Sequence, residues 1–246
     1  MTLREEFEFA GNWLFRWRSY LPLVFIAVSL FALCDYEYLA HSQRLDKLWG
    51  GFCLLVSFFG LAIRAFTVGH TPKGTSGRTT RMPEAERLNT TGMYSIVRHP
   101  LYVANFFIGL GIALFAHLWW LVLIYILAFS LYYEKIMFAE EAYLSKKFGE
   151  EFVSWCDNTP AFIPRLKNHT KPALPFSLKN VLKREYNGFF AVIAVLFAFR
   201  VVGDFFALHK LEIDLHWSIM LIFGFLVWVI LRMLKKKTNL LNVEGR

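Results

Sequence analysis

The chain is poor in cysteine and in charge, and each shortage excludes a class of protein. Three cysteines occur among 246 residues, at positions 34, 53 and 156. An odd number of unevenly spaced cysteines does not support a disulfide framework. Charged residues make up 19% of the chain and hydrophobic residues 56%, and the mean hydropathy is +0.41. Because a soluble domain carries about 25% charged residues, this composition indicates a membrane protein.

Signals for several other kinds of site are also missing. The seven histidines are scattered without His-Glu-x-x-His or Cys-x-x-Cys spacing, so we expect no metal site. The net charge is +8, but the basic residues sit at the ends of apolar segments instead of alternating with aromatics, so we expect no nucleic acid partner. The acidic N-terminal sequence does not resemble a signal peptide. No obligate protein partner is indicated.

The chain does contain long apolar segments, each near the roughly 20 residues that cross a bilayer. The third and fourth are almost continuous, which is typical of a tight helical hairpin. The sequence therefore predicts an all-α, polytopic membrane helix bundle with about six transmembrane helices. The segments cover residues 20–40, 49–69, 101–117, 118–133, 188–208 and 217–234.

Lysine and arginine are unevenly distributed between the connecting segments. They are frequent in the N-terminal arm, in 70–98, in 134–187 and in the tail, but only Lys210 lies in 209–216. Since cytoplasmic loops carry the excess of basic residues, we expect both termini and both long loops to be cytoplasmic. The sequence does not distinguish a bacterial inner membrane from the endoplasmic reticulum.

The apolar segments and the basic loops divide the chain into four parts. We expect an N-terminal arm with the first transmembrane helix, then a membrane core, then a cytoplasmic linker, and finally a pair of transmembrane helices with a basic tail. The corresponding ranges are 1–48, 49–165, 166–187 and 188–246.

The most informative motif is the stretch 92–102, which reads Gly-Met-Tyr-Ser-Ile-Val-Arg-His-Pro-Leu-Tyr. A turn leads through an Arg-His-Pro-x-Tyr step into the third apolar segment, and Pro100 suits the first turn of a helix. The structural interpretation is a capped helix entry with interfacial aromatics. The functional interpretation is a turn that presents backbone N–H groups, His99 and two tyrosines to a ligand. The motif as a whole favours function.

A pair of carboxylates, Glu140 and Glu141, lies on the predicted helical extension 134–149, which should stop at Gly149. Neither glutamate has a lysine or arginine three or four residues onward. They could form a solvated charged face or serve a cationic ligand. Because polar groups at the edge of hydrocarbon are costly unless they are used, both motifs together indicate a site.

These residues carry a family resemblance over roughly 50–165. The Gly-x-Tyr…Arg-His-Pro-x-Tyr step, the Glu-Glu pair, the run 144–152 and the Thr-Pro-Ala-Phe-Ile-Pro end at 159–164 resemble isoprenylcysteine carboxyl methyltransferases and their phospholipid methyltransferase relatives. The resemblance implies a membrane-embedded enzyme that transfers a methyl group from S-adenosylmethionine at the cytoplasmic face. The acceptor would be a lipophilic molecule entering from the bilayer, methylated on a carboxylate, phosphate or amine.

The resemblance also implies roles for individual residues. Arg64 could hold an anionic acceptor, or it could be an interfacial arginine whose charge reaches water. Ile136 stands where the isoprenylcysteine enzymes place an arginine, so the acceptor stays open. The candidate catalytic residues are Arg64, Arg98 and Glu141, and the candidate cofactor-binding residues are Arg87, Leu88, Asn89, Tyr94, His99, Pro100, Leu101, Tyr102 and Glu140.

Two rival functions remain. NADPH-dependent membrane sterol reductases carry a similar Arg-His-Pro-x-Tyr step, but the Glu-Glu pair and the Thr-Pro-x-Phe-Ile-Pro end favour the methyltransferase. A six-helix transporter would place charges or broken helices at mid-membrane and would show related halves. Here the polar motifs cluster on one predicted face, and no internal repeat is visible.

Overall fold

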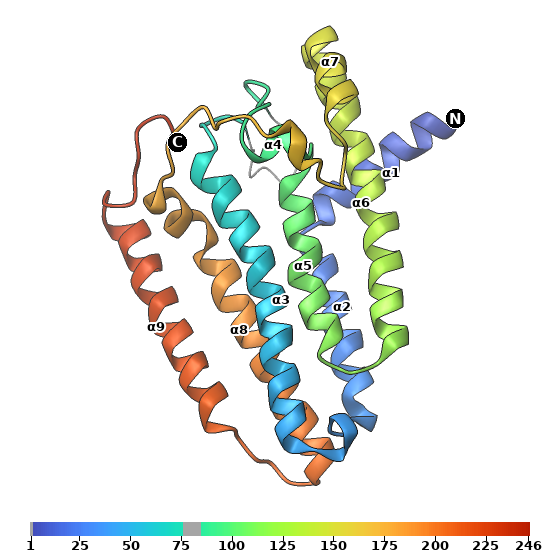
Figure 1. Ribbon diagram of the computed structural model, residues 1–246, viewed down its shortest axis with the longest axis vertical. Helices are drawn as coiled ribbons and strands as arrows, with labels where there is room; N and C mark the ends of the chain where they lie inside the picture. Colours follow the sequence, from blue (N-terminus) through green and yellow to red (C-terminus); the bar gives the residue numbers. More distant parts are fainter. Residues whose placement is uncertain (1, 76–84) are drawn as a thin grey trace.

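The computed structural model describes residues 2–75 and 85–246, and every regular element in this part of the chain is a helix. The helices form an elongated bundle that carries both termini at one end, here called the upper end as drawn in Figure 1. The elements are α1 Leu3–Trp17, α2 Leu21–Ala32, α3 Gln43–His70, α4 Met93–Ile96, α5 Pro100–Leu114, α6 Trp119–Phe148, α7 Glu150–Asn158, α8 Leu178–Leu208 and α9 Leu215–Lys237, with short 3₁₀ helices at Leu33–Asp35, Leu39–His41 and Leu166–Asn168.

Four helices, α3, α6, α8 and α9, are long and apolar enough to cross a membrane. The pair formed by α1 and α2 is a fifth candidate, bent by 72°, and α5 is a shorter apolar helix. The protein is therefore an integral membrane protein with four to five candidate spans among residues 2–75 and 85–246, and the predicted number of six is not confirmed. Each predicted apolar segment does contain a helix, but the first gives only the 12 residues of α2 before the chain breaks into 3₁₀ turns.

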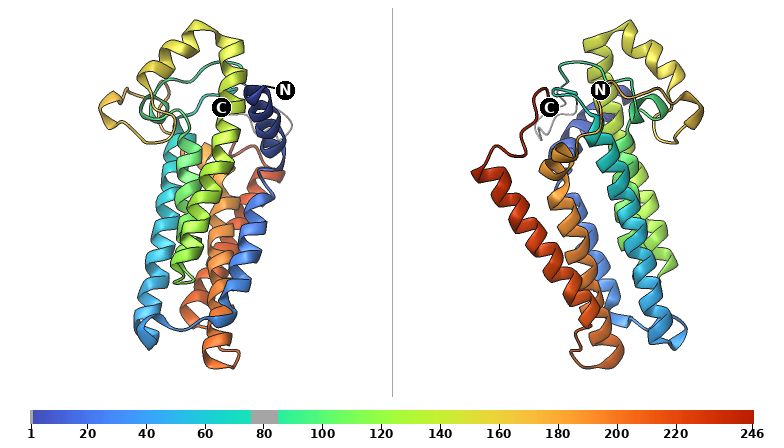
Figure 2. Two further views of the ribbon diagram at one scale, coloured as in Figure 1. Left: turned by 90° about the vertical axis from the view of Figure 1, so that its right-hand side faces the viewer. Right: turned by 60° about the vertical axis from the view of Figure 1, so that its left-hand side comes forward.

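Close packing joins α3 to α5 at the centre of the bundle. A Cβ placed on Gly60 would lie 2.5 Å from the carbonyl oxygen of Ala104, and one on Gly111 would lie 2.4 Å from that of Cys53. Small residues at such positions let membrane helices approach closely. On its other side α3 packs against α8, which carries α9 on its outer face (Figure 2).

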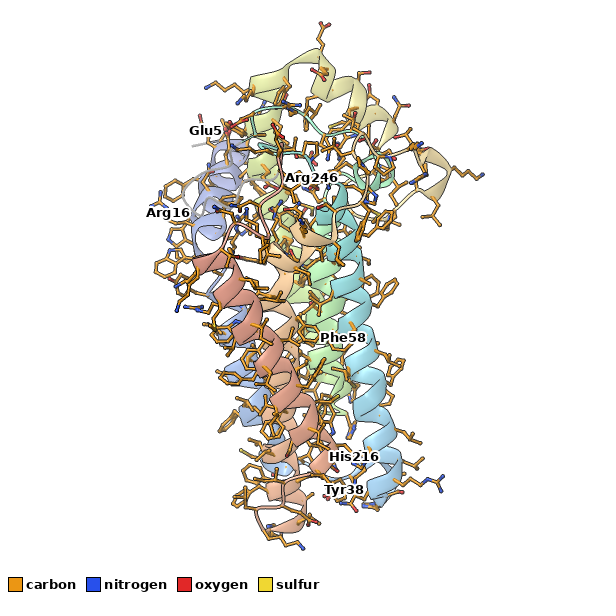
Figure 3. The ribbon with its side chains drawn as sticks, turned by 90° about the vertical axis from the view of Figure 1, so that its left-hand side faces the viewer. Glu5, Arg16, Tyr38, Phe58, His216 and Arg246 are labelled. Atoms are coloured by element: carbon orange, nitrogen blue, oxygen red, sulfur yellow. The ribbon has the colours of Figure 1, made fainter. Side chains whose placement is uncertain are left out.

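A buried ionic cluster fastens the lower end of the bundle. Arg200 of α8 pairs with Asp46 of α3 and, at 2.9 Å, with Asp204. Tyr36 donates to Asp46 at 2.7 Å, and Tyr38, which Figure 3 labels at this end, donates to Asp204 at 3.0 Å. A buried charge left without its partner costs several kcal/mol, so this cluster ties the C-terminal helix pair to the core.

At the upper end, unlike the lower end, two helices, α1 and α6, extend beyond the apolar part of the bundle. α6 runs on to Phe148 and ends at Gly149, whose positive φ of +56° suits a glycine and confirms the predicted stop. α1, which the sequence interpretation treated only as an arm, is a helix packed against α6. The proposed boundary between residues 48 and 49 falls inside α3, and the proposed linker includes the first turns of α8. Of the basic residues in 70–98, those at 78 and 81 lie outside the described part.

Candidate functional site

The Gly-x-Tyr turn is held by backbone geometry that requires glycine. Gly92 has φ +62°, and a Cβ there would lie 3.1 Å from Pro172. Its N–H donates to the carbonyl of Thr170 at 3.2 Å, and the N–H of Thr170 donates to Ser95 Oγ at 2.9 Å. The segment that follows the predicted core thus folds back and fixes the position of α4.

The Arg-His-Pro step is fixed by the Thr-Pro-Ala-Phe-Ile-Pro end of the motif. The N–H groups of Arg98 and His99 donate to the carbonyls of Pro160 and Ala161 at 2.9 and 3.3 Å. The N–H of Arg165 donates back to Ile96 at 2.9 Å. Pro100 begins α5, as predicted. Two motifs some 60 residues apart therefore form one backbone unit, which orients the side chain of His99.

His99 bridges the two carboxylates. Its Nε2 lies 2.9 Å from Glu141 Oε1, and its Nδ1 lies 3.4 Å from Glu140 Oε2. Tyr102 donates to Glu140 Oε2 at 2.9 Å, and its ring stacks on His99 with centroids 5.4 Å apart. Arg98 Nε lies 3.2 Å from Glu141 Oε1, although it is not aimed at that oxygen as a hydrogen bond. The glutamates lack helical partners, as predicted, but find partners on the facing segment.

Electrostatics sets the protonation of this cluster. Burial alone would lower the pKa of His99, but its hydrogen bonds to Glu140 and Glu141 outweigh burial and raise the pKa above its usual 6.5. The two carboxylates thus favour the protonated imidazole, whose two nitrogens face one carboxylate each. Burial, together with the nearby Glu140, raises the pKa of Tyr94 to about 12, so its hydroxyl stays neutral and available as a donor.

A cavity of about 450 Å³ opens beside this cluster, within the range of small-molecule sites. All but one of the residues singled out from the sequence line it. Glu141 instead lines a second cavity, between α1, α6 and α7, so the adjacent carboxylates face different spaces. The structure brings together at the first cavity Arg64, Arg87, Leu88, Asn89, Tyr94, Arg98, His99, Pro100, Leu101, Tyr102 and Glu140.

Arg64 is engaged inside the protein. Its Nε and Nη2 donate to the two carboxylate oxygens of Glu185 at 2.6 and 3.2 Å, and its Nη1 donates to Asn105 at 2.7 Å. Asn105 in turn donates to the hydroxyl of Tyr133 at 3.1 Å. With these partners the Arg64 side chain is 25% exposed, and its role toward an acceptor stays a prediction. The guanidinium already has a bidentate carboxylate partner, which sequence reasoning missed.

Other lining residues were also missed: most come from parts of the chain without a motif, while Leu144 and Phe152 belong to the run 144–152 but were not singled out. Glu185 and Arg184 lie at the start of an apolar segment, where charges are usual. Asn105 carried a signal, since it lies three residues after Tyr102 on the same helical face. The further lining residues are Arg18, Ser19, Thr75, Ala85, Asn105, Tyr133, Tyr143, Leu144, Phe152, Trp155, Arg184 and Glu185.

The protein is thus an integral-membrane protein whose helix bundle holds a cavity for a small molecule at its upper end. Comparison with known proteins specifies it further. The model of the phospholipid methyltransferase family matches residues 47–151. This segment contains the step at 98–102 and both glutamates, so the chain belongs to the phospholipid methyltransferase family, whose members are membrane methyltransferases.

Two curated relatives carry names that refer to metal resistance. The nickel-cobalt-cadmium resistance protein NccN of Alcaligenes xylosoxydans xylosoxydans is 36% identical over 157 residues, which is 63% of this chain and 68% of the relative. The cobalt-zinc-cadmium resistance protein CzcN of Cupriavidus metallidurans is 39% identical over 79 residues, covering 32% and 36% of the two chains. No solved structure matches the chain.

Proposed function

We propose that the protein transfers a methyl group from S-adenosylmethionine to a lipid or lipid-attached acceptor at the cytoplasmic face of the membrane. The observation that carries this proposal is the joint lining of one cavity by Glu140 and by the Arg-His-Pro-x-Tyr step. Membership of a methyltransferase family supports the reaction type.

The residues present fit this cofactor. S-adenosylmethionine, when bound, supplies a methyl group on a positively charged sulfur. Glu140 places a carboxylate on the cavity, and the aromatic rings of Tyr102 and Tyr133, with centroids 4.6 Å apart, line it as well. Arg87, Leu88 and Asn89 line the same cavity from the preceding loop. Glu140 would lie next to the positive charge of the cofactor, while His99 and Tyr102 hold the Glu140 carboxylate in place.

The chain's main contribution would be positioning. Methyl transfer needs the acceptor in line behind the methyl carbon, and holding two reactants in such an arrangement can supply much of the rate enhancement. The cavity is lined by residues of the helices α3 to α8, of the loop before α4 and of the turn between α1 and α2, which would keep water from the reacting atoms. Arg98 and His99 lie beside Glu141, which lines the second cavity, so Glu140 is the member of the pair that lines the proposed cofactor cavity.

A lipophilic acceptor suits the inner part of the cavity. Asn105 and Tyr133 extend its lining onto the apolar helices α5 and α6. If the acceptor is an anionic headgroup, methylation removes a negative charge that attracts divalent cations, which would connect the reaction with the metal resistance in the relatives' names. Cells producing the active protein should then bind less cadmium at their membranes than cells producing Glu140→Gln. Equal cadmium binding by the two kinds of cell would mean that the reaction has no connection with metal resistance.

The membrane arrangement is part of the proposal. We infer that the chain crosses the membrane six times and that α5 and α6 form a tight hairpin. Both termini would lie on the cytoplasmic side, and the loops at the lower end of the bundle would lie on the other side. Single cysteines replacing Lys167 and Leu211, in a background without native cysteines, should react with an impermeant maleimide from opposite sides of sealed vesicles. Labelling of both positions from the same side would contradict this arrangement. Ser76, another natural choice in the first long loop, lies outside the described residues.

The reaction itself can be tested without knowing the acceptor. Purified protein in vesicles made from a total lipid extract of its host should move radioactive methyl groups from S-adenosylmethionine into the organic phase. Glu140→Gln should reduce this transfer, while Glu150→Gln, at an exposed position on α7, should not. NADPH-dependent reduction of lipid in place of methyl transfer would instead support the reductase alternative.

A further inference from the structure

An exposed apolar stripe runs without interruption from α1 onto α2. Its members are separated by four or three residues, a spacing that within each helix keeps them on one face. Each side chain is between 45% and 79% exposed. The stripe consists of Phe9, Trp13, Trp17, Tyr20, Val24, Val28 and Phe31.

The opposite face of α1 is used for packing on the protein. A Cβ on Gly11 would lie 2.1 Å from the carbonyl oxygen of Lys135, so α1 rests directly on the backbone of α6. Phe15 is 2% exposed, and the hydroxyl of Tyr132 donates to the carbonyl of Leu14 at 3.2 Å. The aromatic stripe therefore points away from the bundle.

We propose that α1 lies in the boundary between lipid headgroups and acyl chains, with this stripe immersed in the bilayer. The lower part of the stripe, Val24 to Phe31, belongs to the apolar helix α2, and Tyr20, at the 72° bend, is exposed as well. Above the bend the stripe carries Trp13, Trp17 and Tyr20, and tryptophan and tyrosine are enriched at the membrane interface. Amphipathic helices bind in that plane.

The charges of α1 determine what kind of surface it recognises. Three arginines, at 4, 16 and 18, are balanced by three glutamates, at 5, 6 and 8. The attraction is therefore hydrophobic and does not depend on anionic lipid. Glu6 lies one turn before Phe9 on the same face, which marks where the helix leaves the lipid. Figure 3 shows Glu5 farther toward the upper end than Arg16, in agreement with a helix that sinks toward the bilayer along its length.

Membrane contact by α1 also bears on the cavity. The guanidinium of Arg18 lies 4.0 Å from the centre of the Phe15 ring, and both Arg18 and Ser19 line the cavity. The lipid-bound helix thus places one wall of the site. This inference does not depend on which reaction the site performs.

Spin-label accessibility in nanodiscs of phosphatidylcholine would test the proposal. In a background without native cysteines, nitroxides replacing Trp13 and Trp17 should be more accessible to oxygen than to a water-soluble nickel chelate. A label at Asn12, exposed on the same helix but off the stripe, should show the reverse. Adding phosphatidylglycerol should leave the values unchanged. Equal chelate access at Trp13 and Asn12 would overturn the proposal, as would strong dipolar coupling between labels, which would assign the stripe to a second copy of the chain.

A second readout needs no label. Brominated phosphatidylcholine should quench part of the protein's tryptophan fluorescence, and the quenched part should shrink when Trp13 and Trp17 are both replaced by leucine. Undiminished quenching in that variant would contradict immersion of α1. Because neither measurement involves a cofactor, failure here is distinguishable from failure of the proposed methyl transfer.

Discussion

The two ends of the bundle hold polar clusters built from the same kinds of residue. At the lower end Asp46 and Asp204 surround Arg200, with two tyrosines donating to the carboxylates. At the upper end Glu140 and Glu141 surround His99, with Arg98 and Tyr102 alongside. Composition therefore does not separate the two clusters.

Exposure separates them. The side chains of Asp46, Arg200 and Asp204 are 0%, 2% and 4% exposed, whereas those of Glu140 and Glu141 are 24% and 26% exposed. Glu140 lines a cavity of about 450 Å³. A closed cluster can only hold helices together, while a partly open one can exchange an internal partner for a ligand. The comparison assigns stability to the lower cluster and binding to the upper one.

Arg200→Met should give the largest effect on stability. It leaves two buried carboxylates without their cation, which costs roughly 3–5 kcal/mol when a buried ion pair is broken from one side. The midpoint of thermal unfolding in detergent should fall strongly. Lys210→Met, which breaks the exposed Lys210–Glu212 pair, is the matched control and should change little. A small effect of Arg200→Met would mean that the lower cluster does not fasten the bundle.

Glu140→Gln should have the converse profile, with a large effect on binding and a small one on stability. It keeps the size of the side chain but removes the charge that faces the cavity. Since a hydrogen bond or contact to a charged partner contributes roughly 1.5–3 kcal/mol, affinity for S-adenosylmethionine should fall about ten- to a hundredfold. Titration calorimetry checks this against Glu150→Gln. Unchanged affinity in a folded variant would mean that the Glu140 carboxylate only holds Tyr102 and His99 in place.

The Arg64–Glu185 pair lies between these extremes, because it is half-closed and lines the cavity. Arg64→Gln and Glu185→Gln should each lower the unfolding midpoint, and the double variant should lose less than their sum. A coupling of roughly 0.5–3 kcal/mol is expected for residues in direct contact. Cofactor affinity should stay nearly constant in all three. Strict additivity would mean that the pair contributes no interaction of its own.

The pH dependence of His99 should be the smallest effect. Its pKa is raised in the folded protein by Glu140 and Glu141, so protonated His99 stabilises the fold fully below its unfolded pKa of about 6.5. That stabilisation is lost as pH rises through the raised folded value. Unfolding midpoints measured from pH 6 upward should therefore decline more in the parent than in His99→Gln. Parallel curves would show that folding does not raise the pKa of His99.

The upper cluster was partly predictable because its residues sit in compact motifs. The step at 98–102 and the Glu-Glu pair stand out against apolar neighbours, and every predicted cofactor residue lines the cavity. Their roles stay predictions. Glu185 could not be found in this way, because its partner Arg64 is 121 residues away and no local pattern links them. Only the packing of α8 on α3 brings the two together.

The positions of the helices were largely predictable from the apolar runs, but the number of membrane crossings was not. The apolar residues of α1 are mostly widely spaced aromatics, and its first turns contain glutamates. The mean hydropathy of the segment is therefore low, and a search for apolar runs does not find this helix. The segment 20–40 is apolar throughout its first half, yet it breaks after Ala32 into turns that carry Tyr36 and Tyr38 to the lower cluster. The tertiary role of those tyrosines has no signature in the local sequence.

Titration calorimetry with the purified parent protein tests the central claim most directly. S-adenosylmethionine, or its demethylated product, should bind to one site per chain, Glu140→Gln should weaken that binding about ten- to a hundredfold, and NADPH should neither bind nor compete. Tight binding of NADPH without binding of S-adenosylmethionine would contradict the account.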